Sequence, residues 1–249
     1  MPKKAEVNWI YAYYQGIKDG SFTVGEYIRQ MMQYLVDGLE RRAFIYDQKK
    51  ANAAIEWIET HTFHTEGKLA PNNLILELWE KAFVSALFGI VDENGLRQFR
   101  EAVLIIGRKN GKSLLAAAIA KYIWQIEGGF GAKVYNIAPK LDQADIIYNN
   151  IWQMTLLDPE YQEMKKTLDE RDAHNKRVKD DSELPRHRMS DLFIPAINAQ
   201  VKKIAFSAKK SDGFNPSLCI CDEIASWEGD SGLKQYEVMK SGMGAREEG

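Results

Sequence analysis

The feature that most constrains the fold of this chain is residues 107–113, with the sequence Gly-Arg-Lys-Asn-Gly-Lys-Ser. They follow the short apolar run of residues 101–106 and precede residues 114–120, a leucine- and alanine-rich stretch of strong helix formers. A buried strand, a glycine-containing loop and a helix in direct succession form the context in which a loop binds phosphate groups. We therefore expect a strand–loop–helix unit of an α/β fold here, with an anion site where the helix begins.

The residue types within this loop suit a nucleotide. Gly111 allows the backbone turn that aims successive N–H groups at an anion. Lys112 brings a positive charge to the β- and γ-phosphates, and Ser113 offers a hydroxyl group to Mg²⁺. The usual motif has its first glycine where this chain has Ile106. ATP and Mg²⁺ are the expected cofactors, and the loop residues predicted to bind ATP are Gly107, Arg108, Lys109, Asn110, Gly111, Lys112 and Ser113.

A second motif is the apolar run of residues 217–221, which ends in Asp222 and Glu223. An ATPase needs one carboxylate for the Mg²⁺ shell and another that activates the attacking water. Adjacent residues at a strand end can divide these tasks because successive side chains point in opposite directions. We predict Asp222 as the Mg²⁺-side group, together with Ser113, and Glu223 as the general base. The alternative is an ordinary acidic pair at the start of a turn.

Arg108 is the second catalytic candidate, because it lies inside the phosphate loop itself. A guanidinium group in that position can reach the γ-phosphate and stabilise the charge of the transition state from within the subunit. The alternative for Arg108, and for the neighbouring Lys109, is a solvated loop charge.

The rest of the chain alternates between strand and helix patterns. Strands are predicted at residues 101–106, 133–138, 191–195, 202–207 and 218–221, and a helix at residues 141–157. This alternation predicts an α/β fold with a mostly parallel sheet flanked by helices. Residues 1–66 are predicted to form an N-terminal helical segment packed on the core, and residues 67–249 the phosphate-loop domain. The aromatic side chains of the N-terminal helices, including Tyr27 and Tyr34, are expected in the core.

Composition excludes some function classes. The net charge of −2 argues against a protein that coats nucleic acid, so DNA contacts must be confined to loops. The basic residues 176, 177 and 179 are one candidate loop, although neighbouring aspartates weaken it. No apolar run is long enough to span a membrane, and the N-terminus does not resemble a secretion signal. Cys219 and Cys221 are interpreted as small buried residues in a reducing cytoplasm, and His61 and His64 as a helix-end pair rather than metal ligands.

Landmarks in order along the chain resemble the large terminase subunit of tailed bacteriophages. In that family the phosphate loop replaces the first glycine and carries arginine before Gly-Lys-Ser, as Ile106 and Arg108 do here. Four other segments resemble the family: Leu78-Trp79-Glu80 with Leu87-Phe88-Gly89, Asp142-Gln143-Ala144, Ser207-Ala208 with residues 212–216 leading to Asp222-Glu223, and the closing residues 241–246.

The resemblance implies a RecA-like phosphate-loop ATPase that drives double-stranded DNA into a procapsid. It implies a portal protein and a small terminase subunit as partners, and a ring of identical subunits when assembled, with a monomer as the expected isolated state. The implied location is the host bacterial cytoplasm, transiently docked on the procapsid, with no membrane contact. In the family an arginine from a neighbouring subunit completes each site; the candidates here are Arg171, Arg186 and Arg188.

Two departures from the family pattern affect these expectations. Glu80, implied as an adenine-side residue, stands where the family has glutamine, and a carboxylate cannot donate a hydrogen bond to adenine. The coupling motif and the nuclease domain have no counterpart in these 249 residues, so no DNA cleavage is expected from this chain. Two alternatives stay open: a helicase-like DNA-dependent ATPase, which would need a second RecA-like lobe, and a nucleotide-binding assembly module with little hydrolysis.

Overall fold

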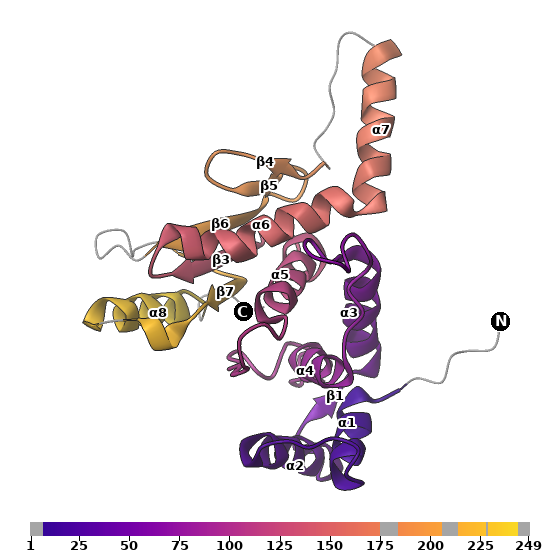
Figure 1. The fold of residues 1–249 in the computed structure, drawn as a ribbon, viewed down its shortest axis with the longest axis vertical. Helices are drawn as coiled ribbons and strands as arrows, with labels where there is room; N and C mark the ends of the chain where they lie inside the picture. The colour runs from indigo at the N-terminus through magenta and orange to yellow at the C-terminus, as the bar shows by residue number, and fades with distance from the viewer. Residues whose placement is uncertain (1–6, 175–183, 206–213, 228, 244–249) are drawn as a thin grey trace, which may run out of the picture. The chain divides into compact units, whose positions relative to one another are not determined.

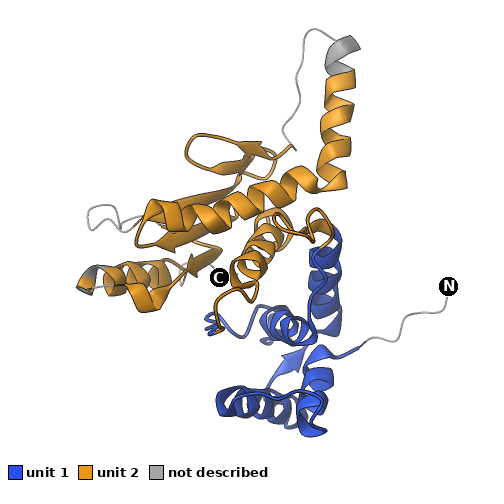
Figure 2. Cartoon of the chain, viewed as in Figure 1, with its two compact units in different colours: residues 1–60, 74–105 blue, residues 61–73, 106–249 orange. Residues whose placement is uncertain are grey.

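The computed structural model describes residues 7–174, 184–205, 214–227 and 229–243. The chain divides into two compact units, coloured separately in Figure 2. Unit 1 comprises residues 1–60 and 74–105, and unit 2 comprises residues 61–73 and 106–249. The division into residues 1–66 and 67–249 stays a prediction, since a contact-based unit and a functional domain are different properties.

Unit 1 is built mainly from helices: α1 (Trp9–Lys18), α2 (Glu26–Glu40), α4 (Leu78–Gly89) and all but the last residue of α3 (Gln48–His61). A small antiparallel pair, β1 (Ile45–Tyr46) and β2 (Ile90–Val91), accompanies them. Asn8 caps α1, because its side chain accepts hydrogen bonds from the backbone N–H groups of Ile10 and Tyr11. Helix α1 packs on α2 and α4 around a core of Ile10, Tyr13, Ile17, Met32, Leu35, Val36, Ala82 and Ile90.

The expectation that the aromatic residues of α2 lie in the core is wrong for two tyrosines. Tyr27 is 86% exposed and Tyr34 is 58% exposed. The buried face of α2 carries Met32 and Leu35, one position beyond Met31 and Tyr34. Apolar side chains thus occupy two adjacent stripes of the helix, so the helical spacing identifies the helix but not the stripe that is buried.

Unit 2 contains a five-stranded mixed sheet with the order β4-β5-β6-β3-β7, seen in Figure 1. Strand β3 (Lys133–Ala138) pairs in parallel with β6 (Ala199–Ala205) and with β7 (Leu218–Cys221). The short strands β4 (Arg186–His187) and β5 (Leu192–Ile194) extend the β6 side in antiparallel fashion. The three parallel strands place their carboxyl ends at the same edge, where α/β proteins bind ligands.

Helices flank this sheet, so the predicted α/β class is confirmed. They are α5 (Lys112–Tyr122), which continues as a π-helical segment (Ile123–Glu127), α6 (Leu141–Leu157), α7 (Pro159–His174) and α8 (Gly229–Met243), with a short 3-10 turn (Ile224–Ser226) after β7. Helix α6 packs against β3, β6 and α5, and α8 contacts β7. Within the described part of the chain, no helix has the length and apolar character needed to cross a bilayer.

One predicted strand does not form. Residues 101–106 have no regular secondary structure, and the side chains of Val103 and Ile105 are 78% and 88% exposed. A strand is stable only when its backbone groups pair with a neighbour, and no described strand pairs with this run. The helix of the expected strand–loop–helix unit is confirmed, and the strand that should precede the loop is a wrong prediction.

Candidate phosphate-binding site

The phosphate loop ends where α5 begins. Gly111 is the N-cap of α5 with φ +75°, a left-handed conformation that costs glycine little. Lys109 also has a positive φ of 66°, which is strained for a residue with a side chain. Within the loop the Asn110 side-chain amide donates to the Gly107 carbonyl at 3.2 Å. The two left-handed residues thus lie directly before the amino end of α5, the end that favours anions.

Lys112 joins the two sequence motifs. Its Nζ lies 2.9 Å from Oδ1 of Asp222, although the two residues are far apart in the chain. Asp222 directly follows β7 and is 9% exposed. Its backbone is fixed on both sides, because its N–H donates to the Ile137 carbonyl at 3.1 Å and its carbonyl accepts from Nε1 of Trp227 at 2.9 Å. A lysine at the helix start and a carboxylate at the strand end therefore share one site.

Glu223 leaves the strand in a left-handed conformation, with φ +52°. Its backbone N–H donates to Oδ1 of Asp222 at 2.9 Å, and its carbonyl accepts from the Ser226 hydroxyl at 2.8 Å. The side chain is exposed, and its Oε2 accepts a hydrogen bond from Nε2 of Gln143 at 3.3 Å. The two carboxylates at the carboxyl end of β7 thus have different partners, Lys112 for Asp222 and Gln143 for Glu223.

The donor set of this site fits a Mg²⁺ ion. The carboxylate of Asp222 and the hydroxyl of Ser113 are the oxygen ligands that Mg²⁺ prefers. Ser113 lies half-buried in the first turn of α5. The ammonium group of Lys112 already occupies a cation position against Asp222, which shows that this carboxylate can hold a positive partner.

Other predicted residues have different surroundings. Arg108 is exposed on the loop. Glu80 belongs to unit 1, where it is buried at the third position of α4, accepts a hydrogen bond from the N–H of Glu77 at 2.8 Å and completes a reciprocal capping box. Burial raises the pKa of Glu80. The helix cap accounts for the contacts of Glu80 that the structure shows.

The candidate arginines also differ from one another. Arg188 donates two hydrogen bonds to the carboxylate of Asp191, from Nε to Oδ1 at 2.7 Å and from Nη2 to Oδ2 at 2.6 Å. Its guanidinium carbon lies 3.9 Å from the ring centroid of Phe193. The side-chain hydrogen bonds to Asp191 raise the pKa of Arg188. Arg186 lies exposed on the edge strand β4. The side chain of Arg171 and the basic residues 176, 177 and 179 fall outside the described part of the chain.

His61 is the last residue of α3, and its side chain pairs with a carboxylate. Its Nδ1 lies 3.2 Å from Oδ2 of Asp158 and 3.7 Å from Oε2 of Glu160. The fully buried ammonium of Lys121 lies 2.6 Å from the same Asp158 oxygen and donates to the His61 carbonyl at 2.7 Å. A lysine of this chain therefore already balances the charge of Asp158.

Cys219 and Cys221 are free thiols whose Sγ atoms lie 3.8 Å apart on β7. Both are half-buried rather than fully buried, because β7 is an edge strand of the described sheet. Their side chains point the same way, as two residues spaced by one must on a strand.

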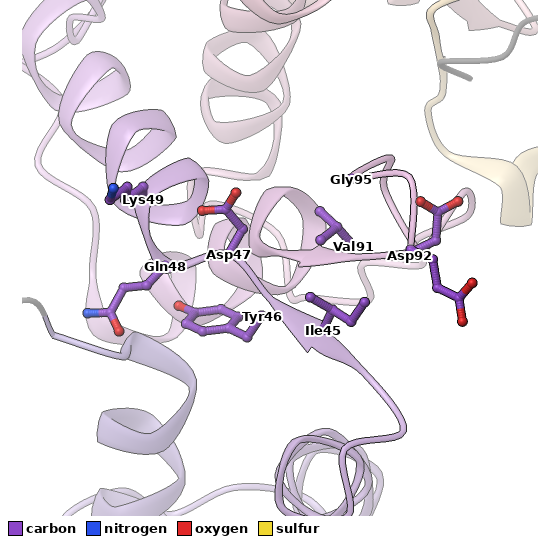
Figure 3. A pocket seen from close by; sticks show the side chains of 9 residues that line it. Ile45, Tyr46, Asp47, Gln48, Lys49, Val91, Asp92 and Gly95 are labelled. Atoms are coloured by element: carbon purple, nitrogen blue, oxygen red, sulfur yellow. The ribbon is translucent and has the colours of Figure 1, made fainter.

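An open pocket in unit 1, shown in Figure 3, contains none of the predicted site residues. Asp47 and Asp92 line it, but both carboxylates serve local turns. Oδ1 of Asp47 accepts from the N–H of Lys50 at 3.0 Å, and Oδ1 of Asp92 accepts from the N–H groups of Asn94 and Leu96 at 2.8 and 2.9 Å. These contacts are those of helix and turn caps.

Comparison with known proteins finds one matching family and several relatives. Residues 78–249 match the family model described as "Terminase large subunit, ATPase domain". The terminase large subunits of Lactococcus phages p2 and SK1 are each 26% identical over 218 residues, covering 86% of this chain and 37% of the relative. The chain thus spans little more than a third of the length of these relatives. The crystal structure of the large terminase of bacteriophage HK97 superposes with a TM-score of 0.59 and 22% identity, over 80% of this chain and 36% of the other, which supports the fold.

Proposed function

Since the chain belongs to the terminase large subunit ATPase-domain family, we propose that it binds ATP with Mg²⁺ at the site shared by Lys112 and Asp222 and hydrolyses it with Glu223 as the general base. The observation that carries this proposal is the 2.9 Å contact between Lys112 and Asp222, with Glu223 next in the chain. A phosphate-binding cation and two carboxylates in one site form the minimum set for phosphoryl transfer to water.

Nucleotide binding would change the partner of Lys112. The triphosphate carries more negative charge than one carboxylate, so the ammonium group of Lys112 moves its hydrogen bonds from Asp222 to the β- and γ-phosphates. The backbone N–H groups of residues 107–113 and the amino end of α5 would stabilise the same anion. Asp222 and Ser113 would then be the residues that hold Mg²⁺.

Hydrolysis would then depend on residues that stabilise charge and move one proton. Glu223 would accept the proton of the attacking water. General-base catalysis of this kind typically raises the reaction rate by roughly 10²–10⁴-fold. Arg108, exposed on the phosphate loop, would stabilise the developing charge on the γ-phosphate. The bound Mg²⁺ supplies Lewis-acid stabilisation of the phosphate oxygens.

The wider role we propose follows from the relatives. We propose, from its membership of the terminase large subunit family, that this chain uses ATP to move double-stranded DNA into a procapsid. It would act as one subunit of a ring and would contact a portal protein and a small terminase subunit in the host cytoplasm. Glu80 would then lie on the adenine side. Of the candidate arginines for the neighbouring site, Arg188 would first have to release Asp191. Arg186, exposed on β4, is the other described candidate.

Nucleotide binding and turnover test this proposal together. We expect the purified chain to bind ATP in the presence of Mg²⁺ and to release phosphate slowly, and Lys112→Met to weaken ATP binding by at least about tenfold, because a charge-assisted contact is lost. Lys166→Met is the matched control, since Lys166 is exposed on α7, where its Nζ lies 4.0 Å from Oε1 of Glu170. Unchanged ATP affinity in Lys112→Met would contradict the proposed site.

A further inference from the structure

Gln143 touches the residue proposed as the base, although it belongs to neither motif. It lies in the first turn of α6, directly after β3. Its Nε2 stands 3.3 Å from Oε2 of Glu223. The contact joins the amino end of α6 to the turn that follows β7, and both elements lie at the carboxyl ends of the neighbouring parallel strands β3 and β7.

The position of Gln143 is fixed by its own helix. Its backbone N–H and that of Ala144 both donate to the Lys140 carbonyl at 3.2 Å. The carbonyl of Ala144, a fully buried residue, accepts a hydrogen bond from the side-chain amide of Asn136 on β3. The first turn of α6 is therefore anchored to β3, and Gln143 reaches Glu223 from this anchored turn.

The orientation of the Gln143 amide follows from hydrogen-bond chemistry. An ionised carboxylate only accepts hydrogen bonds, so the NH₂ group must face Glu223. The amide carbonyl oxygen then faces the other way, where it is buried and has no hydrogen-bond partner among the described residues. A buried hydrogen-bond acceptor without a partner costs free energy, so this orientation of the Gln143 amide is unfavourable by itself. An unsatisfied buried polar group in a protein calls for an explanation, and a functional role is one.

We propose that Gln143 is a positioning residue for ATP hydrolysis, which holds the carboxylate of Glu223 in the direction needed to accept the proton of the attacking water. Glu223 is exposed and lies at the start of the turn after β7, so its own surroundings leave the side chain several rotamers. The amide of Gln143 selects one of them. This inference rests on the proposed function, because it assigns Gln143 a role only through Glu223.

The expected effect is on the chemical step rather than on binding. Gln143→Leu removes the donor while keeping a side chain of similar size. Loss of one hydrogen bond to a charged group should lower kcat by about tenfold. The KM for ATP should stay within about twofold, since Gln143 contacts neither Lys112 nor Asp222 in the described structure.

A second variant and a control separate positioning from folding. Gln143→Glu places a carboxylate next to Glu223 and should lower kcat at least as much as Gln143→Leu, because the two like charges repel. Gln153→Leu is the matched control, since Gln153 is exposed on the same helix. It should leave kcat, KM and the melting temperature unchanged.

The experiment measures kcat, KM and Tm of the full chain and its three variants. A kcat loss confined to the Gln143 variants, with KM and Tm preserved, supports the proposal. An unchanged kcat in Gln143→Leu overturns it while leaving the proposed function intact, and so does a kcat loss that only follows a fall in Tm. A parent chain without ATP hydrolysis overturns the proposed function itself.

Discussion

The buried pair of Lys121 and Asp158 offers a stability test whose size can be worked out from the structure. The side chain of Lys121 is fully buried, and that of Asp158 is 6% exposed. Lys121 lies in the last turn of α5, the helix that begins at Lys112 directly after the phosphate loop. Asp158 lies between α6 and α7. The pair therefore fixes the far end of the helix that positions Lys112.

The perturbation is Lys121→Met, which keeps the chain length and removes the charge. It leaves the carboxylate of Asp158 buried without its ammonium partner at 2.6 Å, and breaking a buried pair in this way costs about 3–5 kcal/mol. Asp158→Asn removes the opposite charge but keeps an acceptor for the N–H of Glu160, which donates to Oδ1 at 3.0 Å. The double variant leaves neither charge unpaired, so it should cost less than the sum of the single variants by about 2–3 kcal/mol.

Urea unfolding of the full chain, followed by circular dichroism, measures these differences. Lys166→Met is the control, because the surface pair of Lys166 with Glu170 at 4.0 Å should contribute less than about 0.5 kcal/mol. A Lys121→Met cost below about 1 kcal/mol, or a double variant whose cost equals the sum of the single costs, would refute the reasoning that Lys121 and Asp158 compensate each other.

Three further predictions follow from the structure. Gly111→Ala should lower the free energy of unfolding by about 1 kcal/mol, because an alanine at φ +75° is strained even though its Cβ would meet no atom within 4 Å. Thermal unfolding measures this loss, and an unchanged melting temperature would contradict the left-handed conformation of Gly111. Burial lowers the pKa of Lys121 from 10.5, so the folded chain loses this proton at a lower pH than the unfolded chain, and the free energy of unfolding should rise as pH increases through the folded pKa towards 10.5, a rise absent in Lys121→Met. On α2, Tyr34→Ser should change the free energy of unfolding by less than about 0.5 kcal/mol, whereas Leu35→Ala should lower it by about 2–4 kcal/mol. Equal costs of the two variants in urea unfolding would contradict the assignment of Leu35, and not Tyr34, to the buried face of α2.

Local sequence signals predict a large part of this fold. The bounds of β3 and α6 coincide with the predicted residues 133–138 and 141–157, since both segments combine a clear hydrophobic period with flanking turns. The meeting of Lys112 with Asp222 also follows from the sequence. A phosphate loop begins a helix, an acidic pair ends a strand, and parallel strands bring such ends to one edge.

Features that depend on distant partners could not be predicted in the same way. Residues 101–106 have the composition of a strand, but strand formation depends on a paired neighbour, which composition does not reveal. Tyr27 has the helical spacing of a core residue, but the position of α1 decides which stripe is covered. Gln143 stands in a recognisable Asp-Gln-Ala segment, yet its contact with Glu223 joins two elements whose distance only the fold defines.

The replacement Glu223→Gln tests the central claim most directly, because it changes one charged atom group and keeps the size of the side chain. Steady-state phosphate release and equilibrium binding of ATP with Mg²⁺ would be measured on the parent chain and on this variant under the same conditions. We expect a low ATP turnover in the parent that the variant loses by at least about 10²-fold, with ATP binding preserved. A variant that hydrolyses ATP as fast as the parent would contradict the assignment of Glu223 as the base.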